Sequence, residues 1–425
     1  MRRFSRSLLV PAFLLGLQAA HAQAPKDVRA AAKPGVSAIP TVAQYLNSQA
    51  VDTRIEAVRQ LIAIGGKDTV DPLIAATRDA DPEVQIRATD GLVNYYLPGY
   101  VKQGLGSSLV RAGASVRAKF SDNNDQVIDA FVVVRPEVIT ALGVMARRGA
   151  SLDSRANACR AIGILRGGAA VPDLIDALRT KDNSVMYEAL VALEKTRDVS
   201  AGPRVVYLLR DLDDRVQTTA IETVGLLRTK EALPTLRGIV GSPRNVKVER
   251  SALFAIAMMP EPQDRDLLLR ELAAKDDRVR AAAAEGLGRI GNPADVEALE
   301  KVWSGEEKMS PRLGAAFALL LEGKMELTQE APFRYLINTL NSAAYKEVSA
   351  AYLIEAARKK PVRDALYAPM EQGSRDEKIY LARVLAVSGD QDSVPYLDKL
   401  SRDTEPDVAQ EGLRALRSLR ARLGT

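Results

Sequence analysis

Apolar residues recur along most of the chain at the spacing of one helix face, in a pattern that repeats about every 31 residues. In residues 277–290, small and branched apolar side chains occupy positions i, i+3, i+4 and i+7, which lie on one side of an α-helix. The pattern recurs at these anchor positions: Ile55, Val84, Ser154, Val185, Val216, Val248, Val279, Leu313, Val348, Ile379 and Val408. This period predicts an all-α fold, a solenoid of about eleven helix pairs over residues 37–420.

Each repeated unit carries residues suited to the ends of two helices. A loop Asp or Asn precedes the first helix, where its side chain can accept a hydrogen bond from an unpaired backbone N–H. Gly follows the last turn, as at Gly65 and Gly291, because Gly readily adopts the conformation that ends a helix. The second helix often has Pro near its start, where no N–H is needed: Pro72, Pro172, Pro203, Pro234 and Pro395.

The repeated unit resembles the HEAT-like repeat family, especially its short bacterial form, first described in phycobilisome lyases. The resemblance covers roughly residues 37–420 with one interruption, and these residues carry it: Asp277, Val279, Arg280, Ala283, Leu287 and Gly288. It implies an α-solenoid built of HEAT-like helix pairs. It does not specify a function, because the family serves many unrelated tasks.

One irregular insertion, about residues 95–135, interrupts the period. Val84 and Ser154 are 70 residues apart, where two units would take about 62 and one about 31. No acidic residue occurs between Val101 and Ser121, so the basic side chains there are not compensated locally. An apolar stretch at 130–134 is suited to an extended conformation.

The insertion is the part of the chain that helix packing alone does not explain, so it carries the candidate contacts to a partner. Tyr is enriched at binding surfaces, and uncompensated positive charge suits an anionic partner or membrane surface. The candidate partner-binding residues are Tyr96, Tyr100, Lys102, Arg111, Arg117 and Lys119. The alternative is an insertion that packs on the solenoid and solvates its charges. The polar cluster at 122–125 is interpreted as a turn rather than a calcium site, because it lacks the EF-hand spacing.

Residues 1–22 have the features of a cleaved secretory signal peptide. A basic start is followed by an apolar stretch at 8–17, too short for a transmembrane helix, and by a small-residue cleavage site that ends at Ala22. An uncleaved anchor is the alternative. We expect a flexible linker at 23–36, the solenoid, a short tail at 421–425, and a periplasmic or secreted product of a bacterial cell.

Composition argues against a nucleic-acid partner. The chain carries 59 Lys and Arg against 54 Asp and Glu, a net charge of +5. Three of those Arg residues lie in the predicted signal peptide, so 59 − 3 = 56 basic residues remain against 54 acidic ones, a net charge of +2. The basic balance is therefore weak support for binding nucleic acid.

Histidine chemistry is absent from the predicted mature chain, because the only His is His21. This excludes Ser-His-Asp and Cys-His nucleophiles and His-based metal sites, and it makes HEAT-like hydroxylases with paired His-Glu motifs unsuitable as templates. Cys159, the single Cys, has no partner for a disulfide within the chain and is interpreted as a core residue. We expect no catalytic residue, no metal and no organic cofactor.

Two hypotheses of function follow. The first is an exported, non-catalytic scaffold or adaptor that binds a protein or peptide partner on a curved helical-repeat surface in the cell envelope. The second is an enzyme or enzyme auxiliary of the HEAT-repeat lyase type. A smooth, exposed concave face favours the scaffold, and a cleft with convergent buried charges favours the enzyme. Both allow peripheral contact with a membrane.

Overall fold

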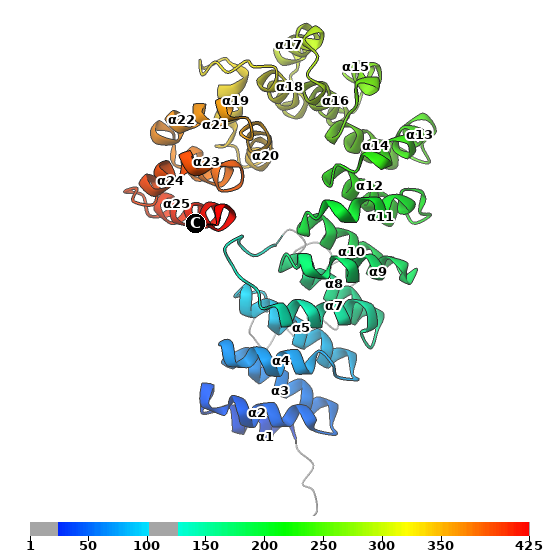
Figure 1. Cartoon of the computed structure of the whole chain (residues 1–425), viewed down its shortest axis with the longest axis vertical. Helices are drawn as coiled ribbons and strands as arrows, with labels where there is room; N and C mark the ends of the chain where they lie inside the picture. The colour runs from blue at the N-terminus through cyan, green and yellow to red at the C-terminus, as the bar shows by residue number, and fades with distance from the viewer. Residues whose placement is uncertain (1–23, 102–125, 425) are drawn as a thin grey trace, which may run out of the picture.

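The computed structural model of the chain describes residues 24–101 and 126–424. Of these residues, 76% are helical and none is in a strand. The helices pair and stack into an arc, with the N-terminal and C-terminal units at its two ends (Figure 1). The predicted all-α solenoid is confirmed.

Long helices form one layer of the arc, and each contains one anchor position of the sequence repeat. They are α3 (Val51–Ile64), α5 (Pro82–Tyr96), α8 (Leu152–Ile164), α10 (Asn183–Thr196), α12 (Asp214–Leu226), α14 (Val246–Met258), α16 (Asp277–Ile290), α18 (Met309–Leu321), α20 (Lys346–Ala356), α23 (Arg375–Ser388) and α25 (Pro406–Leu423). Most anchors are buried, as the pattern predicts, but Val348 is 40% exposed and Ser349 takes the buried position beside it. The unit that contains α20 is therefore rotated slightly against the sequence repeat.

The remaining helices, most of them shorter, form the second layer. They are α4 (Val70–Ala76), α7 (Pro136–Arg148), α9 (Val171–Ala177), α11 (Gly202–Val205), α13 (Leu233–Gly241), α15 (Arg265–Glu271), α17 (Val296–Gly305), α19 (Pro332–Thr339), α21 (Lys360–Ala365), α22 (Tyr367–Gln372) and α24 (Val394–Leu400), preceded in the chain by α1 (Pro25–Ala32) and α2 (Ile39–Gln44). Figure 1 places α13 and α17 outside the arc, and α14 and α18 inside it. The long helices thus line the concave side.

Short 3-10 turns adjoin many of these helices. They are η1 (Gly35–Ala38), η2 (Tyr45–Asn47), η3 (Lys67–Thr69), η5 (Gly168–Ala170), η6 (Leu178–Thr180), η7 (Val199–Ala201), η8 (Val206–Arg210), η9 (Lys230–Ala232), η10 (Pro262–Asp264), η11 (Pro293–Asp295) and η12 (Gln391–Ser393). Within the described residues no helix is long and apolar enough to cross a membrane.

The predicted helix starts are confirmed at several units. Asp81, Asp182 and Asp213 each accept two backbone N–H bonds of the helix that follows. Such a cap satisfies donors that have no partner inside the helix. Gly65 and Gly291 have φ of 68° and 70°, the left-handed region in which Gly avoids a steric cost.

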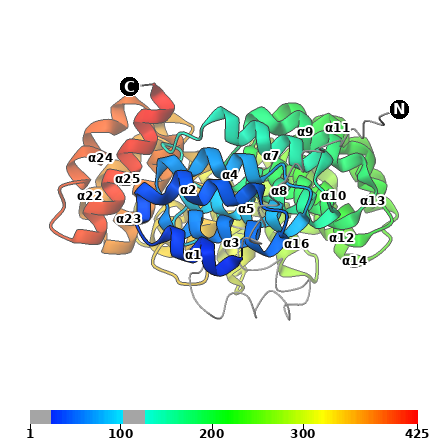
Figure 2. The same cartoon turned by 90° about the horizontal axis from the view of Figure 1, so that it is seen from below.

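The arc tightens in its C-terminal half, where aromatic rings pack between the long helices. Phe317 of α18 stacks on Tyr352 of α20 with ring centroids 4.7 Å apart. Tyr352 in turn donates a hydrogen bond of 2.6 Å to the carboxylate of Glu285 on α16. Seen from below, α24 and α25 lie on one side of the molecule and α9 and α13 on the other (Figure 2).

The structure corrects three expected boundaries. Residues 25–32, expected in a flexible linker, form α1, and Val28 there is fully buried. Helix α25 continues to Leu423, inside the expected tail. In the interrupted stretch, the described residues contain α5 and α7 on either side of the insertion, and the described parts of the insertion, 95–101 and 126–135, contain no strand.

Candidate binding surfaces

The two described ends of the insertion are held against the solenoid. The phenol oxygen of Tyr96 accepts a hydrogen bond of 3.1 Å from the backbone N–H of Arg135. The Arg135 guanidinium also lies 2.7 Å from a carboxylate oxygen of Asp71. Tyr96 packs edge-to-face on Tyr95, and Tyr100 is partly buried against the core. Both candidate tyrosines are therefore at least partly used in attaching the insertion.

The exit of the insertion crosses the ends of several long helices. Ile128 is buried, and its N–H donates to the carbonyl of Ile164 at the end of α8 over 3.0 Å. Lys195, at the end of α10, donates to the carbonyl of Gln126 over 3.3 Å. Asp129 forms an ion pair with Arg414 of α25, so this segment contacts the C-terminal unit of the arc. Residues 126–135 therefore pack on the solenoid.

The other candidate contacts, Lys102, Arg111, Arg117 and Lys119, lie outside the described residues, as does the polar cluster at 122–125. Their roles in binding a partner therefore stay predictions.

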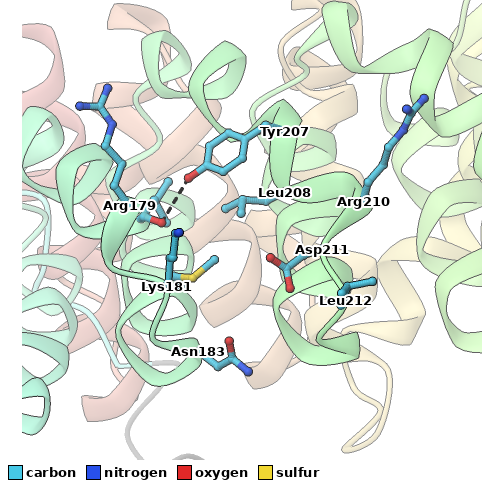
Figure 3. A pocket seen from close by; sticks show the side chains of 10 residues that line it. Arg179, Lys181, Asn183, Tyr207, Leu208, Arg210, Asp211 and Leu212 are labelled. Carbon is cyan, nitrogen blue, oxygen red and sulfur yellow. Dashed lines mark hydrogen bonds between the residues drawn. The ribbon is translucent and has the colours of Figure 1, made fainter.

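A groove lies at what we call the groove edge of the solenoid, formed by loops 178–182 and 209–213, each of which leads into a long helix. It has a volume of ≈ 630 Å³. Its lining residues include Lys181, Asn183, Tyr207, Asp211 and Leu212, drawn in Figure 3. Because neighbouring units contribute both sides, the groove is a product of stacking.

The groove combines exposed apolar side chains with basic groups. Leu212 is 88% exposed and Tyr207 is 58% exposed. The phenol of Tyr207 donates to the carbonyl of Leu178 over 3.2 Å, which fixes the ring beside the loop (Figure 3). Arg179 and Arg210 flank the apolar surface. Large exposed apolar side chains in a shaped depression are typical of surfaces that bind other proteins.

At the opposite ends of the long helices, which we call the insertion edge, three successive helices end in arginine. Arg166, Arg197 and Arg228 follow α8, α10 and α12 at intervals of 31 residues. Their φ angles are 49°, 58° and 53°, so all three are left-handed. The expectation that the units end in Gly is therefore wrong at these three units, although the 31-residue spacing of the arginines was visible in the sequence.

Charged groups on the concave face are mostly paired within the protein. Arg160 of α8 donates to both carboxylate oxygens of the buried Glu188 of α10, at 2.6 and 3.2 Å. Glu355 of α20 receives Arg289 of α16 at 2.9 Å and Arg228 at 2.8 Å. Burial alone would raise the pKa of Glu355, but the bonds from Arg289 and Arg228 lower it overall.

Glu194 of α10 is the main exception. Burial raises its pKa from 4.5 to about 7, while a hydrogen bond of 3.0 Å from the Thr223 hydroxyl opposes that shift. A carboxyl group with a pKa near neutrality can exchange protons under physiological conditions.

The described residues include the single Cys and allow a search for metal-binding side chains. Cys159 is fully buried, and burial raises the pKa of its thiol, which suits the interpretation as a core residue. Within 24–101 and 126–424, no group of three or more His, Cys, Asp or Glu side chains is placed to hold a metal ion.

Comparison with known proteins connects the repeats to two family descriptions. Residues 242–319 match HEAT repeats, and residues 53–79 match the PBS lyase HEAT-like repeat. The chain is 32% identical over 158 residues to phycocyanobilin lyase subunit alpha of Nostoc sp., a match that covers 34% of this chain and 57% of that protein. The chain therefore spans little more than half of that relative.

Two further similarities involve more of the chain. It is 25% identical over 254 residues to deoxyhypusine hydroxylase-B of Oryza sativa subsp. japonica, covering 58% of this chain and 80% of that protein. The solved complex of CpcE and CpcF of phycocyanin lyase from Nostoc sp. PCC7120 shares 23% identity and a TM-score of 0.37, covering 63% of this chain and 92% of that one. The sequence relatives are enzymes, so similarity does not separate a scaffold from an enzyme. The family matches and the stacked helix pairs together show that the chain is a HEAT-like repeat protein.

Proposed function

We propose that this protein is an exported, non-catalytic scaffold that binds a protein or peptide partner on its curved helical-repeat surface in the cell envelope. Export rests on the predicted signal peptide at 1–22, which precedes the described residues. The groove beside Leu212 and Tyr207 is the observation that carries the binding function.

The physical argument starts from Leu212. Its side chain is 88% exposed although it lies in a short loop between packed helices, where a polar residue would serve the fold equally well. Covering a Leu side chain contributes roughly 1.5–3 kcal/mol. A partner that covers Leu212 and the exposed part of Tyr207 buries more apolar surface than Leu212 alone provides, and the flanking Arg179 and Arg210 can orient its polar groups.

The test is affinity capture from an envelope extract of the source organism with the protein lacking residues 1–22. Leu212→Asp combined with Tyr207→Ser should abolish capture of the partner. Val36→Asp is the matched control, because Val36 is also 62% exposed but lies in η1, far along the chain from the groove. Equal capture by all three proteins, with intact helicity, would refute the groove as the binding surface.

The insertion needs a separate variant. Deleting residues 99–134 would remove the buried Ile128 and the Asp129–Arg414 ion pair, so a loss of capture would be ambiguous. Reversing the charges of Lys102, Arg111, Arg117 and Lys119 avoids this problem. If these residues meet an anionic partner, capture should weaken in the variant and in high salt, since screening is strong beyond about 8 Å at physiological ionic strength. Unchanged capture with an intact fold would assign the insertion no binding role.

A second candidate is an enzyme or enzyme auxiliary of the lyase type. Two observations favour it: the 32% identity to a phycocyanobilin lyase subunit, and the raised pKa of Glu194 on the concave side. This candidate predicts that phycocyanobilin mixed with the purified protein co-elutes with it and changes its absorbance. It also predicts that Glu194→Gln alters that signal. Absence of any bilin signal would leave the scaffold as the better function.

A further inference from the structure

Three successive helix ends carry a backbone strain that their neighbours avoid. Gly291 ends α16 with φ 70° and lies 12 residues after the anchor Val279. The equivalent positions, 12 residues after the anchors of α8, α10 and α12, are Arg166, Arg197 and Arg228. Gly adopts this conformation without a steric cost, whereas an L-residue with a Cβ does not. Residues held in such a conformation cluster at functional sites, because folding alone would favour their replacement.

The backbone bonds explain how the strain is held. After α8, the N–H of Gly167 donates to the carbonyl of Ile162 over 2.9 Å, and the N–H of Arg166 donates to the carbonyl of Gly163 over 3.1 Å. Thr229 and Arg228 form the same pair of bonds after α12. These bonds define a Schellman end, whose left-handed residue is usually Gly. Arg197 ends α10 differently, with its N–H donating to the carbonyl of Leu193 over 3.2 Å. In all three units the arginine is the left-handed residue that follows the helix.

The charges of these arginines are poorly compensated. A fourth arginine, Arg358, follows α20 on the other side of the arc (Figure 1). Within the described residues, no hydrogen bond or ion pair involves the guanidinium groups of Arg166, Arg197 and Arg358. The surrounding protein lowers the pKa of Arg197, and the positive charges of Arg166 and Arg358 add to that effect while Glu194 opposes it. Like charges thus converge from both sides of the arc.

Of the nearby acids in the described part of the chain, only Glu355 forms an ion pair with a member of this group, Arg228. Asp198 caps η7 by accepting the N–H of Ser200 and, within the described residues, forms no ion pair with these arginines. Glu355 is bonded to Arg289 as well as to Arg228. Glu194 has a raised pKa and so is partly protonated near neutral pH. Glycine at positions 166, 197 and 228 would remove the strain and reduce the repulsion, so these arginines are candidates for a contact with a partner.

We propose that Arg166, Arg197, Arg228 and Arg358 form an arginine strip that binds an acidic peptide segment of the partner. This inference rests on the proposed partner-binding function and names the chemistry of one contact. Guanidinium groups present a planar pair of donors that matches a carboxylate. The strip lies at the insertion edge, about 20 Å from the groove along α10, since a helix rises 1.5 Å per residue.

The spacing of the strip favours a peptide. Neighbouring long helices pack about 8–10 Å apart, and an extended peptide advances about 3.3 Å per residue. Carboxylates at every third residue would therefore meet successive arginines. A long polyanion such as nucleic acid is less suited, because the predicted mature chain, with 56 basic and 54 acidic residues, lacks the strong net charge that attracts one.

The test uses fluorescence anisotropy with the complete protein lacking residues 1–22. The probe is a labelled peptide of about twelve residues with Glu at every third position and Ser or Gly between, spanning the strip at about 3.3 Å per residue. A second peptide has the same composition with its Glu residues in one block. We expect the spaced peptide to bind more tightly, and affinity to fall as salt rises.

Variants then assign the contact. The triple change Arg166→Gly, Arg197→Gly and Arg228→Gly should weaken binding of the spaced peptide at least about tenfold, since a tenfold change needs only about 1.4 kcal/mol. The triple change to Lys keeps the charges and should retain most of the binding. The charge-matched control is Arg204→Gln, Lys275→Gln and Lys301→Gln, all exposed and not members of the strip, and should bind as the wild type does.

Three results would overturn the inference. These are equal affinity in the wild type and the triple Gly variant, equal loss in the control variant, or equally effective competition by single-stranded DNA of the same charge, which would indicate an unselective polyanion surface. Continued capture of a partner from envelope extract alongside any of these results would refute the strip alone. Loss of capture only in the Leu212 and Tyr207 variant would leave the proposed function standing. Helicity measured by circular dichroism confirms that each variant is folded.

Discussion

Replacing Arg197 with Gly should stabilise the protein although it removes a side chain. Arg197 holds φ at 58°, and the left-handed conformation costs an L-residue about 1–2 kcal/mol. Gly removes that cost but loses about 0.5–1 kcal/mol because its unfolded chain is more flexible. The difference is a gain of roughly 0–1.5 kcal/mol. Relief of repulsion from Arg166 and Arg358 adds to it, so Arg197→Gly should lie in the upper half of that range.

Two matched substitutions separate strain from charge. Lys181→Gly makes the same backbone change at φ 59°, at the groove edge before the same helix, α10. Arg228→Gly gains the same strain relief but breaks the 2.8 Å ion pair with the partly buried Glu355, worth about 1 kcal/mol, so its net effect should be near zero. The expected order of stabilisation is Arg197→Gly, then Lys181→Gly, then Arg228→Gly.

Urea denaturation followed by circular dichroism measures these effects as shifts of the transition midpoint. Because repeat arrays unfold unit by unit, hydrogen exchange in α8, α10 and α12 should show the same order locally. High salt should reduce the advantage of Arg197→Gly over Lys181→Gly, since only the first relieves repulsion. Any loss of stability in Arg197→Gly would refute the reasoning, because the Arg side chain would then contribute more than the strain costs.

Other predictions test the titration of Glu194, the packing between the long helices and the cleavage of the signal peptide. The pKa of Glu194 is raised from 4.5 to about 7 in the fold, so its contribution to stability is complete below pH 4.5 and is lost as pH rises through about 7. Glu194→Gln should abolish that loss and raise stability at pH 8 by roughly 1–2 kcal/mol, measured by urea denaturation across pH. Gly288→Ala should destabilise by about 1–3 kcal/mol, because its Cβ would lie 2.5 Å from the Cα of Ala318. Gly238→Ala, with nothing within 4 Å of the new methyl group, should stabilise by about 0.5–1 kcal/mol, and thermal melts that showed equal effects at the two glycines would contradict this packing. Cleavage after Ala22 should appear in N-terminal mass spectrometry of the periplasmic or secreted protein, and recovery of the intact chain from the cytosol would disprove export.

The chain's local patterns determined its helices. The helix period, the capping residues such as Asp81 and Asp213, and the Pro residues at helix starts act over a few positions, so they can be identified without knowing what packs against them. The anchor spacing likewise indicated one long helix per unit. Boundaries were less accurate at the chain ends, where α1 and the end of α25 gain their stability from packing on neighbours.

The candidate binding residues were only partly identifiable from the sequence. Sequence reasoning singled out the insertion because it breaks the period, and it identified Tyr96 and Tyr100 there. It did not find the groove, because Tyr207 and Leu212 are unremarkable in a local pattern and become a surface only when two loops stack. Nor did it find the contact between Arg414 and Asp129, which are 285 residues apart in the chain.

The curvature of the solenoid explains why the sequence determined the helices but not the binding surfaces. The sequence by itself determined that helix pairs stack, since burial of an apolar face is a local requirement. The angle between successive pairs depends on small differences in side-chain volume, such as Phe317 stacked on Tyr352, and these add over many units. Only the tertiary structure therefore decided that Arg358 returns to Arg197, and that three arginines 31 residues apart lie on one edge with few compensating charges.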